Sequence, residues 1–262
     1  MPRPPAEATT SSPRVVLFDM DDTLFDHTFA LRQALVATWR RDAGLRRRPL
    51  HAVVDEYARL LDDIHPDVLR GLRTHAEARA ERFRRLFEWA DSPRTAEEIA
   101  GLSAAYRATY QSSRRTVPGA MPLLRALRGR ATVGIVTNNH TVEQREKLEA
   151  TGLAPWIDFL LTSEDAGFEK PDPAIFRMAL ERAGAAPVDA VMVGDRWEAD
   201  VVGARAAGIR PVWYNPTGRA RPEPGTDVVE IRSFRPVRAL APRLLAPGSD
   251  PAVGGGSSSP GL

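Results

Sequence analysis

The stretch VVLFDMDDT, residues 15–23, decides the fold. Its first four residues form an apolar run bounded by polar ones, which is typical of a short buried strand. Asp19 and Asp21 follow at the carboxyl end of this strand. Two carboxylates are costly to place there without a positive partner. We therefore predict a divalent cation and an anionic substrate at this point, with one aspartate as nucleophile and the other as general acid/base.

Composition limits the class of protein. The chain has 262 residues, 43% of them hydrophobic and 27% charged, which is enough for one large domain or two modest ones with a real core. It has no cysteine, which excludes thiolate chemistry and disulfides and fits a cytoplasmic protein. The net charge of +2 is spread without long blocks, so we expect no nucleic-acid polymer as partner. We expect neither a signal peptide nor a membrane span.

Lysine usage singles out two positions. Of 36 basic residues 34 are Arg, and Lys147 and Lys170 are the only lysines. Against that bias, a retained lysine marks a place where an ammonium group is wanted. Lys170 lies in the turn-rich loop GFEKPDP, residues 167–173, and we expect it to be functional. Lys147 lies in a helical pattern, and we expect it at the surface.

The first half of the chain is dominated by helical patterns. Residues 1–12 and 246–262 have the composition of a disordered and a flexible tail. Between residues 28 and 112 apolar stripes recur at helical spacing and predict an all-α bundle of about four helices. The second helix is expected to end at Pro66, the third to begin near Leu72, and the fourth to open with a capping box of Thr95 and Glu98.

The second half alternates helix and strand. Strands are predicted at 132–137, 159–162, 190–194 and 211–214. Thr141 with Gln144 is expected to open one intervening helix, and Asp172 with Pro173 another. This alternation implies a parallel sheet covered on both faces. The predicted fold is therefore α/β, with a three-layer Rossmann-like core (13–26 and 115–245) and an inserted all-helical cap (27–114).

Reactive side chains follow several predicted strands. In open α/β sheets ligands bind beyond the carboxyl ends of the strands. Asp19 and Asp21 follow the first strand, the segment TNN (137–139) ends the second, Lys170 lies in the loop after the third, and GDRWEAD (194–200) follows the fourth. Each alone has an ordinary structural explanation: Thr137 as a strand-end hydroxyl, Lys170 as a surface residue, Asp195 as a helix cap. Their common placement on one edge favours a functional site.

The strings FDMDDT, IVTNN, EKPDPAIF and VGDRWEAD resemble the motifs of the haloacid dehalogenase-like (HAD) hydrolase superfamily. They are most similar to the subgroup with a helical cap between the first and second motifs. The resemblance covers about residues 14–240. It implies a Mg²⁺-dependent phosphomonoester hydrolase that forms an aspartyl-phosphate and acts on a small phosphorylated metabolite.

The resemblance also implies roles for the motif residues. Asp19 would attack phosphorus, and Asp21 would protonate the leaving oxygen and then deprotonate the hydrolytic water. Thr137 would donate its hydroxyl to a phosphoryl oxygen. Lys170 would neutralise the charge on the phosphoryl group and on Asp19.

The same resemblance implies a metal site. Mg²⁺ would take carboxylates from Asp19 and Asp195 and the backbone carbonyl of Asp21, with Asp200 as a further ligand or a support. Backbone amides would complete the phosphate cradle, namely those of Met20, Asp21 and Asn138. Dehalogenases of this superfamily lack the second aspartate of the first motif, so Asp21 favours phosphoryl transfer. Arg196 stands where many relatives have Ser or Asn; we expect it to point away as a surface residue, with a reach toward substrate or cap as the alternative.

Substrate choice is assigned to the cap and to the loop before it. Each candidate there has packing or a solvated surface as its more common explanation: Phe25, His27, Trp39, Arg73, His75 and Arg79. His27 is the first choice as a substrate contact because it lies so close to the catalytic loop. His140 could face the site or only start a helix.

The stretch AAGIRPVWYNP, residues 206–216, resembles nucleotidase-like and sugar-phosphatase-like members. It favours a nucleoside 5′-monophosphate or a sugar phosphate as substrate. Two alternatives stay open, a phosphomutase or other phosphotransferase and a non-catalytic regulator of the same fold. We expect a monomer or a homodimer.

Overall fold

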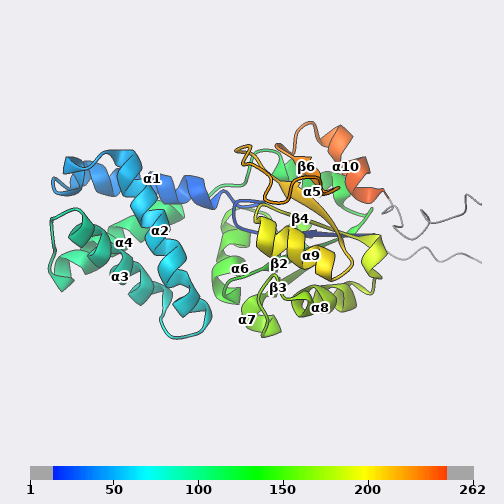
Figure 1. The fold of residues 1–262 in the computed structure, drawn as a ribbon, viewed down its shortest axis with the longest axis horizontal. Helices are drawn as coiled ribbons and strands as arrows, with labels where there is room; N and C mark the ends of the chain where they lie inside the picture. Colours follow the sequence, from blue (N-terminus) through cyan, green and yellow to red (C-terminus); the bar gives the residue numbers. More distant parts are fainter. Residues whose placement is uncertain (1–13, 247–262) are drawn as a thin grey trace, which may run out of the picture.

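The structure is a computed structural model that describes residues 14–246. The predicted tail at 1–12, and all of the predicted tail at 246–262 except its first residue, therefore lie outside the described residues. Its centre is a six-stranded parallel sheet with the strand order β3-β2-β1-β4-β5-β6 (Figure 1). The strands are β1 Val15–Phe18, β2 Thr132–Thr137, β3 Phe159–Thr162, β4 Ala190–Gly194, β5 Arg210–Tyr214 and β6 Val229–Ile231.

The first strand lies in the middle of the sheet. β1 pairs with β2 on one side and with β4 on the other. All of its residues are buried: Val16 and Phe18 belong to the core on one face, and Val15 and Leu17 to the core on the other. Because both faces are covered, the strand is a continuous apolar run rather than an alternating one.

Helices cover both faces of the sheet and confirm the three-layer α/β core. α5 (Ala120–Leu127), α6 (Thr141–Ala150) and α10 (Val237–Leu245) contribute to one core. α8 (Pro173–Ala183) and α9 (Gly203–Ala206) contribute to the other. Two further elements lie near the carboxyl ends of the strands, namely α7 (Ser163–Ala166) after β3 and a π-helical segment, Trp197–Val202, after β4.

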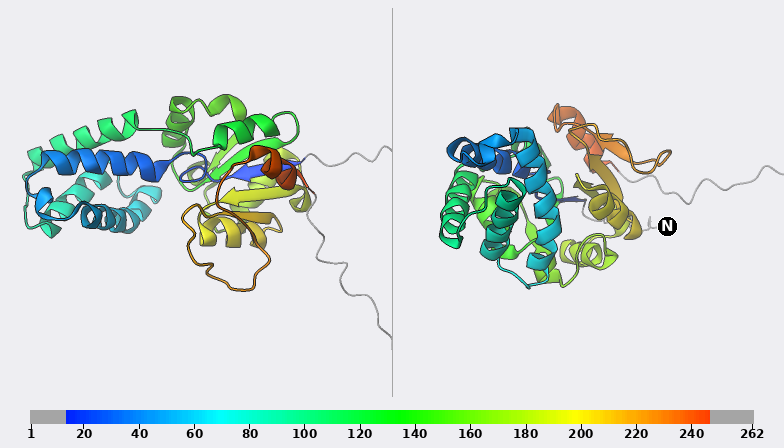
Figure 2. Two further views of the ribbon diagram at one scale, coloured as in Figure 1. Left: turned by 90° about the horizontal axis from the view of Figure 1, so that it is seen from above. Right: turned by 60° about the vertical axis from the view of Figure 1, so that its left-hand side comes forward.

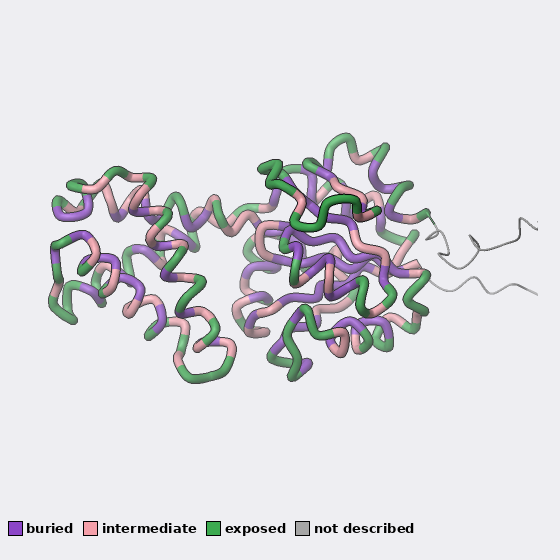
Figure 3. Tube along the Cα trace, viewed as in Figure 1, coloured by how far each residue is buried: buried purple, intermediate pink, exposed green. Residues whose placement is uncertain are grey.

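The other helices form a separate lobe beyond the carboxyl edge of the sheet (Figures 1 and 2). They are α1 His27–Arg41, α2 Leu50–Leu69, α3 His75–Trp89 and α4 Ala96–Ser112. Aromatic side chains fill the interior of this lobe: Tyr57, Phe83, Phe87 and Tyr106. Along its helices buried residues alternate with exposed ones, whereas the central strands β1 and β4 are buried throughout (Figure 3).

The chain enters and leaves the helical lobe through two adjacent segments. Asp26 N–H donates to Arg115 O at 3.0 Å, and Val117 N–H donates to Leu24 O at 2.9 Å. The carboxylate of Asp26 also pairs with the guanidinium of Arg115 at 2.7 Å. The lobe is therefore joined to the sheet by a short paired connection that begins only a few residues after Asp19.

Several local predictions are confirmed. Thr95 and Glu98 form the expected capping box of α4, and Asp172 caps α8 with Pro173 at its first position. Among the described residues no helix is both long and apolar enough to cross a membrane.

Other local predictions were wrong. α2 continues through Pro66 to Leu69, because the missing N–H removes a single hydrogen bond while Val68 extends the buried stripe. α3 begins at His75 rather than near Leu72, since Thr74 and Glu77 form a capping box there and Leu72 is exposed. Neither β6 nor α10 was predicted.

Candidate functional site

The parallel sheet brings the ends of its central strands together. Asp19 directly follows β1, Thr137 is the last residue of β2, and Asp195 directly follows β4. Asp19 N–H donates to Val193 O at 2.9 Å, so the pairing of β1 with β4 continues to the first aspartate. All three side chains are buried. The predicted motif residues therefore meet at one edge of the sheet.

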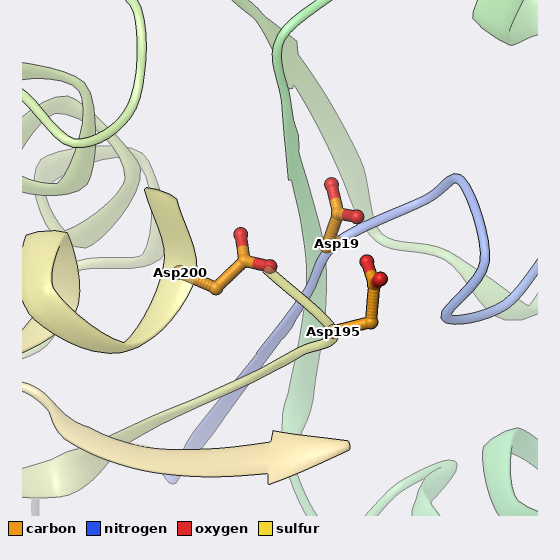
Figure 4. Close-up of side chains that lie close together, drawn as sticks. All are labelled: Asp19, Asp195 and Asp200. Atoms are coloured by element: carbon orange, nitrogen blue, oxygen red, sulfur yellow. The ribbon is translucent and has the colours of Figure 1, made fainter. Parts of the chain in front are cut away.

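Asp19, Asp195 and Asp200 form a cluster of carboxylates (Figure 4). Each offers an oxygen atom within 4.8 Å of those of the other two. Figure 4 shows the three side chains pointing toward a shared space, Asp19 and Asp195 from strand ends and Asp200 from the following helical segment. Clustered carboxylate oxygens are the donors that Mg²⁺ prefers, so the residues fit such an ion.

Burial makes this cluster unfavourable without a cation. It raises the pKa of Asp19 well above its usual value, with Asp200 and Asp195 adding repulsion. Burial also raises the pKa of Asp195 to about 7, and Asp200 adds to the effect. Two charged neighbours inside a poorly solvated site disfavour ionisation in this way. A cation bound among the three groups would remove the repulsion.

Lys170 supplies part of the missing positive charge. Its Nζ donates to Asp19 Oδ1 at 2.7 Å and to Asp200 Oδ1 at 2.6 Å. Burial opposes its charge, but Asp19 and Asp200 together raise the pKa of Lys170 above its usual value. Asn138 fixes the lysine backbone, because its side chain bonds both Lys170 N–H and Lys170 O at 2.8 Å. Lys170 therefore lies at the carboxylate cluster, beside Asp19 and Asp200.

Lys147 is the second cation of the site, and its assignment to the surface was wrong. Its residue is 2% exposed, and its Nζ donates to Asp21 Oδ1 at 2.7 Å and Oδ2 at 2.9 Å. Although burial opposes ionisation, Lys147 and His27 lower the pKa of Asp21 well below its usual value. The periodicity of the sequence predicted the helix α6, but it did not predict that the face carrying Lys147 packs over the strand ends.

The predicted start of α6 at Thr141 is confirmed, but Gln144 takes no part in capping this helix. His140 is the N-cap of α6, and Thr141 N–H donates to Glu164 instead. Gln144 is fully buried, and its Nε2 donates to Asp21 Oδ2 at 3.0 Å and to Thr137 Oγ1 at 2.8 Å. It thus connects the carboxylate of the first motif with the hydroxyl of the second. Tertiary partners replaced the local hydrogen bond that the sequence pattern favours.

The loop between β1 and the helical lobe is a tight turn. Met20 is buried, and Met20 O accepts from Leu24 N–H at 3.0 Å and Phe25 N–H at 2.9 Å. Asp22 has a positive φ of 57°, a conformation that is uncommon outside glycine and occurs at functional loops. Its carboxylate accepts from Thr28 N–H and Oγ1–H at 2.7 and 2.8 Å. The turn thereby ties the aspartates to the start of α1.

The two histidines singled out in the sequence lie at the junction of lobe and core. The Nδ1 atom of His27 is 2.8 Å from Tyr110 Oη and 3.9 Å from Asp21 Oδ1. His27 therefore lies beside the first motif, as expected. His140 caps α6, and its Nε2 is 3.0 Å from Val68 O of the helical lobe, so it contacts the lobe rather than the carboxylates.

The other candidates in the lobe divide into two groups. His75 and Arg79 line a cavity between lobe and core. Trp39 instead donates to Arg48 O, and Arg73 pairs with Asp67, so these two have structural roles. Phe25 is buried in the core, and Lys147 Nζ lies 5.3 Å from its ring centroid.

Of two arginines near the fourth motif, one points to solvent and the other contacts Asp195. Arg196 is exposed, as expected. Arg219, from the loop after β5, was not predicted at the site; its Nη2 donates to Asp195 O at 2.8 Å and lies 3.3 Å from Asp195 Oδ2. No local pattern marks Arg219. Lys147 did carry a signal, because the rarity of lysine that pointed to Lys170 applied equally to it.

Comparisons with known proteins agree with the motif assignment. The family described as haloacid dehalogenase-like hydrolase matches residues 13–208. The pyrimidine 5′-nucleotidase YjjG of Escherichia coli is 33% identical over 216 residues, covering 79% of this chain and 88% of its own. The ribulose-1,5-bisphosphate 5-phosphatase of Halopiger xanaduensis is 34% identical over 206 residues, covering 77% of this chain and 84% of its own.

A solved structure shares the architecture. The HAD-hydrolase YfnB from Bacillus subtilis, bound to magnesium and described as revealing interdomain movement, superposes with a TM-score of 0.69. It is 26% identical, and the match covers 88% of this chain and all of the other. The fold of most of this chain is therefore one that a related protein also adopts.

The Lys147–Asp21 pair can be tested by a stability measurement. Lys147→Met leaves the Asp21 carboxylate without its cation, so the free energy of unfolding should fall by about 2 kcal/mol. Arg145→Met is the matched control, because Arg145 is an exposed cation on the same helix, and its change should stay within about 0.5 kcal/mol. Equal stability of both variants in urea unfolding would contradict the pairing.

A second prediction concerns Gly194. A Cβ atom at Gly194 would lie 2.2 Å from Asp200 Oδ2, so Gly194→Ala must displace Asp200 from the cluster. We expect a loss of about 1–3 kcal/mol of stability, as for other overpacked sites. Gly101→Ala is the control, since nothing lies within 4 Å of its added methyl group. A Gly194→Ala protein as stable as the control in the same urea titration would show that Asp200 is not held where the structure has it.

Proposed function

We propose that this protein, which belongs to the haloacid dehalogenase-like hydrolase family, is a Mg²⁺-dependent phosphomonoester hydrolase that forms an aspartyl-phosphate on Asp19. One observation carries the proposal: Asp19 and Asp21 lie two residues apart, yet each is bound to a different buried lysine, Lys170 and Lys147. Carboxylates in such different surroundings are suited to different tasks. The relatives named as phosphatases and a nucleotidase support this reaction class.

The first half of the reaction transfers the phosphoryl group to the protein. An oxygen of Asp19 forms a bond to phosphorus while the ester P–O bond breaks, and a proton from Asp21 goes to the leaving alkoxide. Lys170 and the hydroxyl of Thr137 stabilise the charge on the phosphoryl oxygens. Backbone amides of Met20, Asp21 and Asn138 would complete the phosphate cradle.

The second half releases inorganic phosphate. Asp21, now ionised, takes a proton from water, and the resulting hydroxide attacks phosphorus while the bond to Asp19 breaks. Gln144 and Lys147 hold the Asp21 carboxylate in its ionised form, which suits the role of base. Protonation for the first half requires this hold to loosen when substrate binds. Lys147 and Gln144 both lie on α6 of the core, so we assign the change to the bound phosphate ester, whose negative charge beside Asp21 disfavours the ionised carboxylate.

The proposed metal site uses the carboxylate cluster. Asp19 and Asp195 would bind Mg²⁺ together with the backbone carbonyl of Asp21, and Asp200 would be a ligand or support. When bound, the ion neutralises charge on the transferred phosphoryl group. The magnesium-bound relative from Bacillus subtilis supports this choice of ion. Arg219 helps to hold Asp195 in place through a hydrogen bond to the Asp195 carbonyl oxygen.

The proposed substrate is a small phosphorylated metabolite in the cytoplasm. A nucleoside monophosphate and a sugar phosphate are both represented among the relatives' named substrates. A phosphotransferase would form the same intermediate and pass the phosphoryl group to a sugar hydroxyl. Measuring released phosphate against isomerised ester distinguishes the two reactions, and we expect stoichiometric phosphate.

The mechanism makes a direct prediction about Asp19. Asp19→Asn removes the nucleophilic oxygen while keeping the shape of the side chain, so turnover of p-nitrophenyl phosphate should fall by at least about 10³-fold. Removal of Mg²⁺ with EDTA should have a comparable effect, and added Mg²⁺ should restore activity. Release of p-nitrophenol in a continuous assay measures both.

The matched control is Asp165→Asn, an exposed aspartate on α7 outside the cluster. Its activity should equal that of the unmodified protein. Turnover that survives both the Asp19→Asn substitution and metal removal would exclude the proposed mechanism.

A further inference from the structure

A cavity of about 80 Å³ lies between the helical cap and α6 of the core. It is lined by residues of all the cap helices and of the strand-end region, among them His27, His65, His75, Arg79, Arg82 and Lys147. Two of these, His27 and Lys147, also lie against Asp21. The cavity therefore begins where the proposed general acid meets the leaving group.

Some of the charges in the cavity wall are matched. Lys147 pairs with Asp21 at 2.7 Å. Glu143 has two cations near it, Arg107 at 3.8 Å and Arg114 at 3.6 Å. Glu146 is a second carboxylate for Arg107, at 3.6 Å. These groups balance one another and leave no surplus negative charge for the remaining arginines.

Arg79 and Arg82 are the unmatched cations of the cavity. Within residues 14–246 neither has a carboxylate within 4.0 Å. Arg79 Nε donates only to Ser103 Oγ, at 3.1 Å. Arg82 is 8% exposed, and its Nε is buried with no hydrogen-bond acceptor among the described residues. Its guanidinium lies 5.5 Å from the ring centroid of Tyr57, a weak substitute for an anion.

A buried guanidinium without a partner is costly, and the surrounding groups do not relieve it. The neighbouring imidazoles are held neutral: burial, with Arg82 next, lowers the pKa of His65 to about 4. Burial likewise lowers the pKa of His75, and its Nε2 is also buried without a partner. The cavity thus combines uncompensated positive charge with unused hydrogen-bond donors, and an anion would satisfy both.

We propose that Arg79 and Arg82 bind a second anionic group of the substrate, so that the protein acts on phosphate monoesters whose alcohol part carries a carboxylate or a second phosphate. This inference rests on the proposed phosphatase function and names its substrate class. The planar guanidinium donates two parallel hydrogen bonds to either kind of anion. The cavity has room for one such group beside the two arginines.

A matched pair of substrates tests the proposal. 3-Phosphoglycerate and glycerol 3-phosphate differ by a carboxylate in place of a hydroxymethyl group. We expect kcat/KM to favour 3-phosphoglycerate by about 10- to 100-fold, the effect of one or two charge-assisted hydrogen bonds. A second pair, fructose 1,6-bisphosphate and fructose 6-phosphate, is compared by the same kcat/KM ratio and tests a phosphate as the second anion. The pair with the larger ratio identifies the anion as carboxylate or phosphate.

Variants locate the effect. In Arg82→Met the preference for the anionic member of the pair should shrink by about 10-fold or more. Arg84→Met is the control, because Arg84 is an exposed arginine on the same helix, and it should keep the preference of the unmodified protein. Arg82→Met should also unfold at a higher temperature, since it removes an unpaired buried charge. A lower melting temperature with an unchanged preference would assign Arg82 a structural role and contradict the proposal.

The outcomes separate this inference from the proposed function. Turnover of p-nitrophenyl phosphate without any preference within either pair would overturn the second-anion site and leave the phosphatase intact. Should p-nitrophenyl phosphate not be turned over, calorimetric binding of 3-phosphoglycerate to the full-length protein still decides the matter. Binding weakened about 10-fold by Arg82→Met supports the site, and equal binding by both proteins refutes it.

Discussion

The structure depends on how two neighbouring carboxylates are kept buried at the end of one strand. Asp19 and Asp21 are separated by one residue, so without partners they would repel each other in a poorly solvated place. Lys170 reaches Asp19 from the loop after α7, and Lys147 reaches Asp21 from α6. The strand order sets this arrangement, because β2 and β3 lie on one side of β1, and the segments that carry the two lysines follow these two strands in the chain.

The two ion pairs divide the site into halves with different chemistry. Around Asp19 the carboxylates of Asp195 and Asp200 outnumber the single ammonium of Lys170, which leaves a need for a divalent cation. Around Asp21 the balance is the opposite, with Lys147 and Gln144 both donating to it. The first half is suited to binding metal and phosphoryl group, and the second to moving a proton beside the leaving group.

The cavity in the cap adjoins the half of the site around Asp21. It starts at the partners of Asp21 and ends at Arg79 and Arg82, whose unmatched charges reduce stability in the absence of a ligand. Positive charge held unpaired inside a small lobe is unusual for a purely structural element. An anionic group of the substrate would pair with these arginines and remove this loss of stability. Substrate choice in the cap would then be linked to the chemistry at the strand ends.

Much of the fold and the motif positions could be predicted from the sequence, since apolar strand runs and their carboxyl-end polar residues are local patterns. β6 was missed because Val229–Ile231 is only 3 residues long. Lys147 was misassigned to the surface, and the contact of Gln144 with Asp21 was missed, because periodicity identifies a helix but not which of its faces lies over a neighbouring strand. Arg82 was not singled out, since burial without a partner is a property of tertiary packing.

The covalent step at Asp19 is the central claim, and chemical trapping tests it most directly. An acyl phosphate is reduced by borohydride, so an enzyme quenched during turnover with Mg²⁺ and substrate should carry homoserine in place of Asp19 when its peptides are analysed by mass spectrometry. The account predicts this change at position 19 alone, and only when substrate is present. Unmodified Asp19 during active turnover, or reduction at Asp21 instead, would contradict it.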